Sequence, residues 1–248
     1  MRKARLSDFL ARNPFENGLT DGLFYREKMR AIHRISPDVL GPGDRPARIL
    51  DIGGGRSGLA AMLYPGAEVY TIDIDPDLAH QSPPEVKTVF VCGDATRLPF
   101  TDGTFDAVTL FDVLEHVVED KAAAVEALRV TTPGGAVLIS TPTAAWRYPY
   151  FSLMKPVCPH ESELMAEWGH VRRGYTQADL VGIFGRKPER RASFINPLTA
   201  FAHDLAFSHL GKRKRKLLHA LASPLTAAGY LLHHPAMPGT ETALAWRR

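Results

Sequence analysis

The sequence is poor in cysteine, since Cys92 and Cys158 are the only two among 248 residues. Because Cys92 falls in a strand that we predict to be buried, we expect free thiols and a reducing compartment. No stretch is long and apolar enough to span a bilayer. The basic residues near the N-terminus are followed by no apolar run, so we expect no signal peptide. These absences favour a cytoplasmic protein.

Acidic residues are scarce in the last quarter of the chain. Residues 186–248 carry 11 Lys and Arg against 3 Asp and Glu, a net charge of +8, whereas residues 1–185 carry 19 against 24, a net charge of −5. The densest basic run, residues 212–216, leads into a helical leucine pattern that we expect Pro224 to break. We expect an anionic partner here, either a membrane surface contacted peripherally through residues 212–232 or an anionic acceptor. Nucleic acid is disfavoured, because no aromatic residues lie between the basic ones.

Glycine, by contrast, is concentrated in one turn that follows a short apolar strand at residues 48–52. Gly53, Gly55 and Gly58 fit the pattern G-x-G-x-x-G, and Asp73 ends the next strand 20 residues beyond Gly53, as in a dinucleotide site. Asp51, two residues before the first glycine, would repel a pyrophosphate but suits a cationic ligand such as an ammonium or a sulfonium. The turn therefore predicts a bound small molecule, and Asp51 favours a cationic one.

Residues 50–58, LDIGGGRSG, resemble the first motif of class I S-adenosylmethionine-dependent methyltransferases of the methyltransferase-11 or ubiquinone-biosynthesis type. Later segments match that family in order and spacing as far as residue 142. The resemblance implies S-adenosylmethionine as the cofactor, with Asp73 on the ribose and Asp94 with Ala95 on the adenine. The cofactor-binding residues that we predict in this way are Asp51, Gly53, Gly55, Asp73, Asp94, Ala95 and Phe111.

Apolar strands alternate with helical segments from residue 48 to residue 142, which predicts an α/β fold with a doubly wound, mostly parallel sheet. We expect seven strands, at residues 48–52, 68–73, 87–92, 105–111, 135–141, 190–196 and 240–246. The resemblance implies that the last is antiparallel. We divide the chain into a helical N-terminal cap (1–43) and a methyltransferase domain (44–248). Two insertions, 143–175 and 197–239, leave from carboxyl ends of strands, so we expect them to form a lid over the site.

His116 and His170 are the catalytic candidates. Transfer of a methyl group to a hydroxyl requires removal of a proton, and imidazole titrates near neutrality. The alternative is that both rings only fix loop geometry by hydrogen bonds. Asp112, Glu115 and His116 also have the spacing of three metal ligands on one helical turn. Because this Glu-His pair is widespread in the family without a metal, we predict none.

The acceptor stays open at this point. Tyr25, Arg26 and Lys28 of the cap are candidates for contact with cofactor or substrate. We expect methyl transfer to oxygen of a small molecule, a quinone-like ring or a sugar of a lipid-linked glycan, and the basic tail and the aromatic lid favour the glycan. Two other functions remain: an NAD(P)-dependent Rossmann oxidoreductase, and a non-catalytic protein that binds S-adenosylmethionine.

Overall fold

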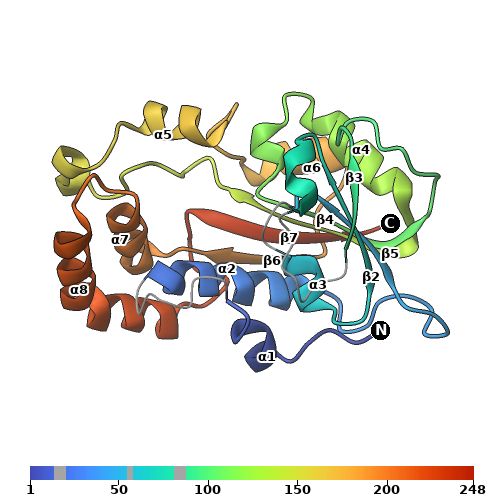
Figure 1. Ribbon diagram of the computed structural model, residues 1–248, viewed down its shortest axis with the longest axis horizontal. Helices are drawn as coiled ribbons and strands as arrows, with labels where there is room; N and C mark the ends of the chain where they lie inside the picture. Colours follow the sequence, from blue (N-terminus) through green and yellow to red (C-terminus); the bar gives the residue numbers. More distant parts are fainter. Residues whose placement is uncertain (14–20, 55–57, 81–87) are drawn as a thin grey trace.

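The computed structural model describes residues 1–13, 21–54, 58–80 and 88–248. A seven-stranded sheet with the order β3-β2-β1-β4-β5-β7-β6 runs through it (Figure 1). Strands β1 to β5 pair in parallel, and β7 lies antiparallel between β5 and β6. The predicted fold is therefore confirmed. The strands are β1 (Arg48–Ile52), β2 (Glu68–Asp73), β3 (Thr88–Cys92), β4 (Phe105–Phe111), β5 (Thr131–Pro142), β6 (Arg190–Phe194) and β7 (Glu241–Arg247).

Helices cover both faces of the sheet, and this explains why its central strands read as continuous apolar runs. Every residue of β4 is buried. One core cluster joins the sheet to α2 (Asp21–Ile35) and α3 (Leu59–Leu63), and the second joins it to α4 (Asp120–Val130) and α6 (Gln177–Phe184). The short α1 (Leu6–Leu10) packs beside α2. The central strands are thus held between two apolar layers.

Cys92 corrects one expectation. We predicted a buried strand, but Cys92 is exposed, whereas Cys158 is buried, and both are free cysteines. The reason is the position of β3, which pairs only with β2 and forms an edge of the sheet. An edge strand leaves part of its surface to solvent, so an apolar sequence there does not guarantee burial.

The two insertions form helices at one end of the sheet (Figure 1). Residues 143–175 contain η3 (Ser152–Val157) and α5 (Glu161–Trp168), and residues 197–239 contain α7 (Pro197–Ala206) and α8 (Lys212–Leu232). Two short 3-10 helices, η1 (Pro76–His80) and η2 (Leu114–His116), follow β2 and β4. The expected break at Pro224 is wrong, because α8 continues through it. A proline removes one interior hydrogen bond and bends a helix without always ending it, and Figure 1 shows α8 bending along its length.

Among the described residues, no helix has both the length and the apolar character that crossing a bilayer would require.

Candidate active site

The carboxyl ends of β1, β2 and β4 and the segment after β3 surround a cavity of about 540 Å³, which we call the first cavity. In an open parallel sheet the ligand site lies at this edge, where the strand order reverses. Here the reversal falls between β1 and β4. Four of the seven predicted cofactor residues line the first cavity: Gly53, Asp73, Asp94 and Ala95. Gly55 lies outside the described residues.

Gly53 occupies a position that only glycine fills without strain. Its φ is 62°, and a Cβ added there would lie 2.6 Å from Cγ2 of Val113. Its amide donates to the Ile72 carbonyl oxygen at 2.8 Å, which ties the turn to the end of β2. Positive φ costs a residue with a side chain about 1–2 kcal/mol. The backbone of this turn therefore forms the cavity wall itself, with no side chain between it and a ligand.

Asp73 and Asp94 are each held by a turn that follows their strand. One Asp73 carboxylate oxygen accepts from the Asp75 amide at 3.1 Å, and one Asp94 oxygen accepts from the Thr96 amide at 2.8 Å. A carboxylate has several lone pairs, so one hydrogen bond leaves it able to accept more. These two side chains can thus receive the hydroxyls and amine of a nucleoside in the first cavity.

Asp51 and Phe111 line neither the first cavity nor the smaller second cavity beside it. Asp51 is 2% exposed and accepts a hydrogen bond from the Thr109 hydroxyl at 2.5 Å. Burial raises its pKa to about 6. Its carboxylate lies beneath the turn, because a Cβ on Gly54 would be 2.3 Å from it. Phe111 packs in the core, so contact of either residue with the cofactor stays a prediction.

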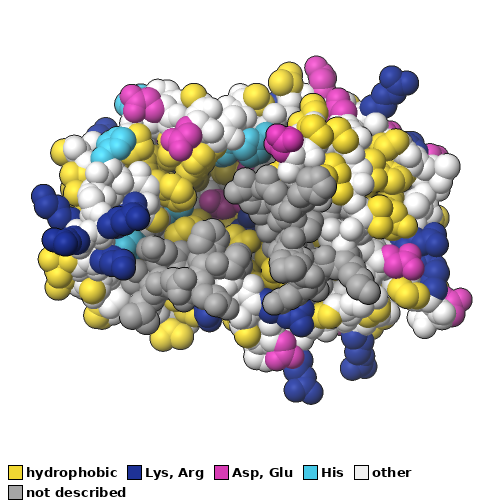
Figure 2. Space-filling view, viewed as in Figure 1, with side chains coloured by type: hydrophobic (Ala, Val, Ile, Leu, Met, Phe, Trp, Pro, Cys, Tyr) yellow, Lys and Arg dark blue, Asp and Glu magenta, His cyan; other side chains and the backbone are white. Residues whose placement is uncertain are grey.

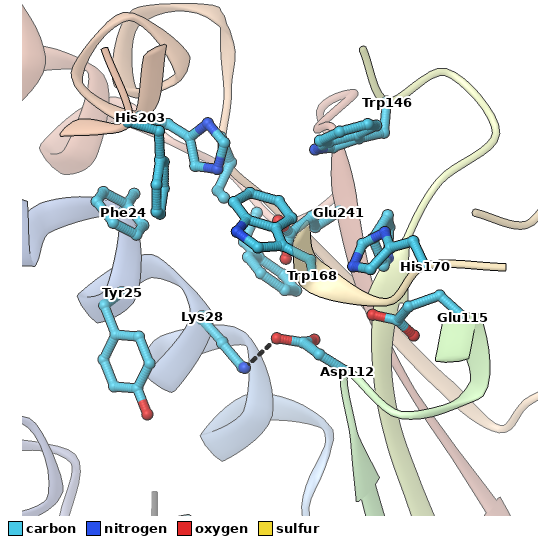
Figure 3. Close-up of a pocket in the computed structure, with 14 residues that line it drawn as sticks. Phe24, Tyr25, Lys28, Asp112, Glu115, Trp146, Trp168, His170, His203 and Glu241 are labelled. Carbon is cyan, nitrogen blue, oxygen red and sulfur yellow. Dashed lines mark hydrogen bonds and ion pairs between the residues drawn. The ribbon is translucent and has the colours of Figure 1, made fainter. Parts of the chain in front are cut away.

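A second cavity, of about 180 Å³, lies between α2, β6, α7 and the first insertion. Asp112 lines both cavities. Figure 3 shows the labelled side chains converging on this space from elements that are far apart in the sequence. Most of its walls are aromatic or imidazole rings, contributed by Phe24, Tyr25, Trp146, Trp168, His170, Phe194, His203 and Phe207. The two cavities together offer a polar site and an aromatic site that meet at one carboxylate.

Lys28 of α2 forms an ion pair with Asp112, which also accepts from the Ser140 hydroxyl at 2.6 Å (Figure 3). Burial opposes ionisation of Asp112, but the Lys28 ammonium and the hydrogen bonds outweigh it and hold the pKa of Asp112 below its usual value. Tyr25 also lines the second cavity, whereas Arg26, the third cap candidate, is not among the residues lining either cavity. The cap therefore contributes directly to the site through Lys28 and Tyr25.

Two non-glycine residues in the described part of the chain have positive φ, and both line the second cavity. Asp112 and Ile195 each have a φ of 55°. For a β-branched residue this is a rare conformation, which persists only where surrounding contacts impose it. The Glu27 carboxylate of α2 accepts from the Ile195 amide at 2.7 Å, the Thr199 hydroxyl at 2.8 Å and the Asn196 side-chain amide at 2.9 Å. Glu27 thus fixes the connection between the end of β6 and the start of α7.

The two predicted catalytic histidines lie together. His116 lines the first cavity, His170 lines the second, and their ring centroids are 4.7 Å apart at 90°. Nδ1 of His116 lies 3.2 Å from the Gly169 carbonyl oxygen. Because a carbonyl only accepts, a neutral His116 carries its proton on Nδ1. Burial lowers the pKa of His170 to about 4, which keeps its ring neutral at pH 7. Their catalytic roles stay predictions.

The structure replaces Asp112 by His170 in the candidate metal cluster. One ligand atom from each of Glu115, His116 and His170 lies within 4.8 Å of the others. Oε1 of Glu115 and Nδ1 of His170 are buried without a hydrogen-bond partner. A carboxylate and two imidazoles suit a transition metal. However, burial and then repulsion by Asp112 raise the pKa of Glu115 well above its usual value. A bound cation would itself stabilise the ionised carboxylate, so this shift describes the metal-free site, and the absence of a metal stays a prediction.

Sequence analysis missed Glu27, His203 and Glu241. Glu241 begins β7 and faces the second cavity, where burial raises its pKa to about 8. No local motif marks these three residues. The available signal was weak, because other polar residues stand beside these three in sequence, such as Lys28 after Glu27 and Asp204 after His203. Buried ionisable groups of this kind are costly to keep and often mark function.

The sheet order, with an antiparallel β7 between β5 and β6, and the cavity at the ends of β1, β2 and β4 together define the class I methyltransferase fold. The comparisons agree, since a family model described as a methyltransferase domain matches residues 50–139. Over these residues the chain resembles the class I S-adenosylmethionine-dependent methyltransferases.

Curated relatives share part of their length with this chain. A demethylmenaquinone methyltransferase of Renibacterium salmoninarum is 33% identical over 146 residues, which cover 56% of this chain and 57% of the relative. One from Beutenbergia cavernae is 39% identical over 117 residues, which cover 45% and 47%. The chain thus spans about half the length of these relatives.

Solved structures support the fold alone. A methyltransferase of Thermotoga maritima is 14% identical with a TM-score of 0.54, covering 92% of this chain and 90% of that one. The 4+2 cyclase SpnF is 18% identical with a TM-score of 0.54, covering 98% and 92%. Since one of these two is described as a cyclase, the fold does not determine the reaction.

Proposed function

We propose that this protein transfers the methyl group of S-adenosylmethionine to an oxygen of a flat, quinone-like ring held in the second cavity. The observation that carries the proposal is the meeting of two unlike cavities at Asp112, one with carboxylates on its walls and one with aromatic rings. Such an arrangement suits a donor and an acceptor that must lie in line.

S-adenosylmethionine, the cofactor of this class, fits the first cavity. The bare backbone at Gly53 permits a close approach, and the carboxylates of Asp73 and Asp94 offer acceptors for ribose hydroxyls and the adenine amine. When bound, the cofactor supplies an electrophilic methyl group on a positively charged sulfur. The negative charges of Asp73 and Asp94 favour a cation at this edge of the sheet.

In the second cavity, the rings of Phe24, Trp168 and Phe207 would stack against or meet the edge of a planar acceptor. Burial lowers the pKa of His170 to about 4, so its ring is neutral but weakly basic at pH 7. It would accept the proton of the acceptor hydroxyl as the methyl group is transferred, when that hydroxyl becomes strongly acidic. The surrounding aromatic side chains limit the access of water to that proton transfer. His116, on the side of the first cavity, would orient the His170 ring.

The names of the relatives support a quinone-like acceptor. Two proteins that match this chain are demethylmenaquinone methyltransferases, and a quinone ring would suit the aromatic walls of the second cavity. Because the match covers about half of each relative, the acceptor is a proposal for this chain. A lipid-linked glycan, which the basic tail and the aromatic lid favoured, is the second candidate acceptor, since the cavity also carries Lys28, Asp112 and Glu241 on its walls.

The oxidoreductase alternative predicts a different sheet. A dinucleotide-binding fold has the order 3-2-1-4-5-6, whereas here β7 lies between β5 and β6. A non-catalytic protein that binds S-adenosylmethionine is the remaining alternative, and the ionisable groups around the second cavity speak against it. Buried ionisable groups are costly to keep and often mark function.

The test is a methyl-transfer assay with labelled S-adenosylmethionine and a panel of acceptors: reduced naphthoquinones, monocyclic phenols, aliphatic alcohols and an undecaprenyl-linked sugar. We expect label on the ring compounds, and loss of that label in Trp168→Ala with S-adenosylmethionine binding retained. Label on the sugar alone would contradict the ring acceptor. Stoichiometric cofactor binding with no turnover on any acceptor would favour the non-catalytic alternative.

A further inference from the structure

Helix α8 buries small and polar residues and exposes its leucines, which is the reverse of an ordinary amphipathic helix. Its buried residues are small or polar, namely His219, Thr226 and Gly229. A Cβ on Gly229 would lie 2.6 Å from Cβ of Leu198, so α8 and α7 approach closely at that point. The leucines of α8 instead face solvent. Surface helices normally bury their apolar face, so this one presents an apolar surface that the described chain leaves uncovered.

Three of these leucines form a ridge. Leu217, Leu221 and Leu225 follow one another at intervals of four residues and are 61%, 70% and 52% exposed. Residues spaced by four lie on one side of a helix. Leu231 and Leu232, near the end of α8, are 73% and 77% exposed. We call the first three residues the α8 ridge.

A basic cluster begins the same helix. Residues 212–216 are all Lys or Arg, and no Asp or Glu occurs between residues 205 and 240. In Figure 2, Lys and Arg side chains gather beside hydrophobic ones at the end of the molecule where α8 lies. Arg215 is used internally, since its guanidinium donates to the Ala206 carbonyl oxygen at 3.1 Å. The other four basic residues are exposed. The neighbourhood of the ridge is thus positive, with no acid in the same segment.

The cluster also adjoins the second cavity. Ala206 ends α7, and the adjacent Phe207 lines that cavity and is 37% exposed. His203, one turn earlier, lines it too. The hydrogen bond from Arg215 therefore fixes the start of α8 against the helix end that forms a wall of the second cavity.

We propose that α8 docks the protein on an anionic lipid bilayer, with the α8 ridge in the interfacial region and the basic cluster on the headgroups. Apolar side chains and nearby cations are the two contributions that hold a helix at such a surface. A lipid-soluble acceptor then enters the second cavity past Phe207 without crossing water. The docking stands independently of the proposed function, whereas the entry route rests on it.

Vesicle flotation with the full chain tests the docking. We expect binding to vesicles of phosphatidylcholine with 30% phosphatidylglycerol, weak binding to pure phosphatidylcholine, and release in high salt, because screening removes the attraction. Leu217→Gln/Leu221→Gln and, separately, Lys212→Gln/Arg213→Gln/Lys214→Gln/Lys216→Gln should each lower the partition coefficient by at least about tenfold. Arg215 is left in place because of its internal contact.

The matched control is Lys121→Gln/Val125→Gln on α4. Lys121 and Val125 are both exposed and separated by four residues, so this pair removes a cation and an apolar side chain from another helix. Vesicle binding should stay within about twofold of the parent. Thermal unfolding of each variant, within 2 °C of the parent, shows that the fold is intact.

Three outcomes would overturn the docking: no binding of the parent to anionic vesicles, equal loss in the α4 control, or a concentration-dependent dimer that the leucine variant abolishes while vesicle binding persists. The entry route has its own readout. Turnover of a short-chain, water-soluble ring acceptor should be unchanged in the α8 variants, and turnover of a long-chain acceptor in vesicles should fall. Failure of the short-chain assay in the parent would count against the proposed function and leave the flotation result intact.

Discussion

The first and second cavities lie side by side but are built in different ways. The walls of the first come from the ends of adjacent strands and the short turns after them, all between residues 52 and 119. The walls of the second come from α2, the first insertion, α7 and β7, from residue 24 to residue 241. The first cavity is therefore fixed by the sheet itself, whereas the second depends on how separate helices are held against it.

Lys28 and Glu27 hold α2 against the sheet and against the start of α7. Of the changes considered, removal of Lys28 should have the largest effect on stability and activity. Lys28→Met leaves the Asp112 charge largely buried without its partner, which should cost roughly 3 kcal/mol of unfolding free energy. Because Asp112 lines both cavities, methyl transfer should fall by more than about 100-fold. Urea denaturation and initial rates measure the two effects. The double variant Lys28→Met/Asp112→Asn should recover stability but not activity; recovery of neither would show that the ion pair is not the cause.

Gly53→Ala should damage the first cavity alone. The new Cβ would lie 2.6 Å from Cγ2 of Val113 at a positive φ, so we expect a loss of about 1–2 kcal/mol in stability and cofactor binding weakened by roughly tenfold or more. Calorimetric titration with S-adenosylmethionine measures the binding. Gly53→Ala/Val113→Ala relieves the contact but not the φ, and should recover part of the affinity. Unchanged affinity in Gly53→Ala would remove this turn from the site.

The second cavity should give the protein a pH-dependent stability through Glu241. Burial raises the pKa of Glu241 to about 8 from an ordinary value of 4.5. Between these values the unfolded chain has lost the proton and the folded chain keeps it, so the free energy of unfolding falls as pH rises from about 4.5 to 8. Glu241→Gln should reduce that fall by roughly 1–3 kcal/mol.

Denaturation at intervals between pH 4.5 and 8.5 measures this slope. Glu167→Gln, an exposed acid on α5, is the control and should leave it unchanged. An identical slope in the parent and Glu241→Gln would mean that this carboxyl is not buried as a neutral group.

The smallest expected effect is that of metal removal. Because the resemblance to the family implies a Glu115–His116 pair without a metal, we expect dialysis against EDTA to leave methyl transfer and the melting temperature unchanged. Loss of activity that Zn²⁺ or Mg²⁺ restores, together with absence of the rescue in His170→Ala, would instead assign an ion to Glu115, His116 and His170.

The contrast between the cavities also explains what the sequence could predict. Strand ends and their turns are local features, so the predicted strands and the family resemblance placed Gly53, Asp73 and Asp94 correctly on one edge of the sheet. His116 and His170 were both named as catalytic candidates, but the contact between their rings was not predicted, because His170 lies in an insertion whose position depends on packing. Cys92 was misplaced because strand order in space, which decides whether a strand is at an edge, is not a local property.

The second cavity was harder to predict because it has no motif. Nothing in the local sequence sets Glu241 or His203 apart, and the residues that surround them in the cavity come from α2 and the first insertion, more than 30 residues away in sequence. Lys28 was a candidate only because cap helices often reach the site. The continuity of α8 through Pro224 depended on packing against α7, which overrides the local preference of one proline.

The central claim is that cofactor binding belongs to the strand ends and acceptor binding to the helices, with Asp112 shared. Calorimetric titration with S-adenosylmethionine of two double variants tests it most directly: Asp73→Ala/Asp94→Ala in the first cavity, and Phe24→Ala/Trp168→Ala in the second. We expect affinity to fall by at least about 100-fold in the former, since each lost hydrogen-bond pair costs roughly 1.5 kcal/mol, and to stay within about threefold in the latter. Equal affinities in the two variants, or no affinity in the parent protein, would contradict the account.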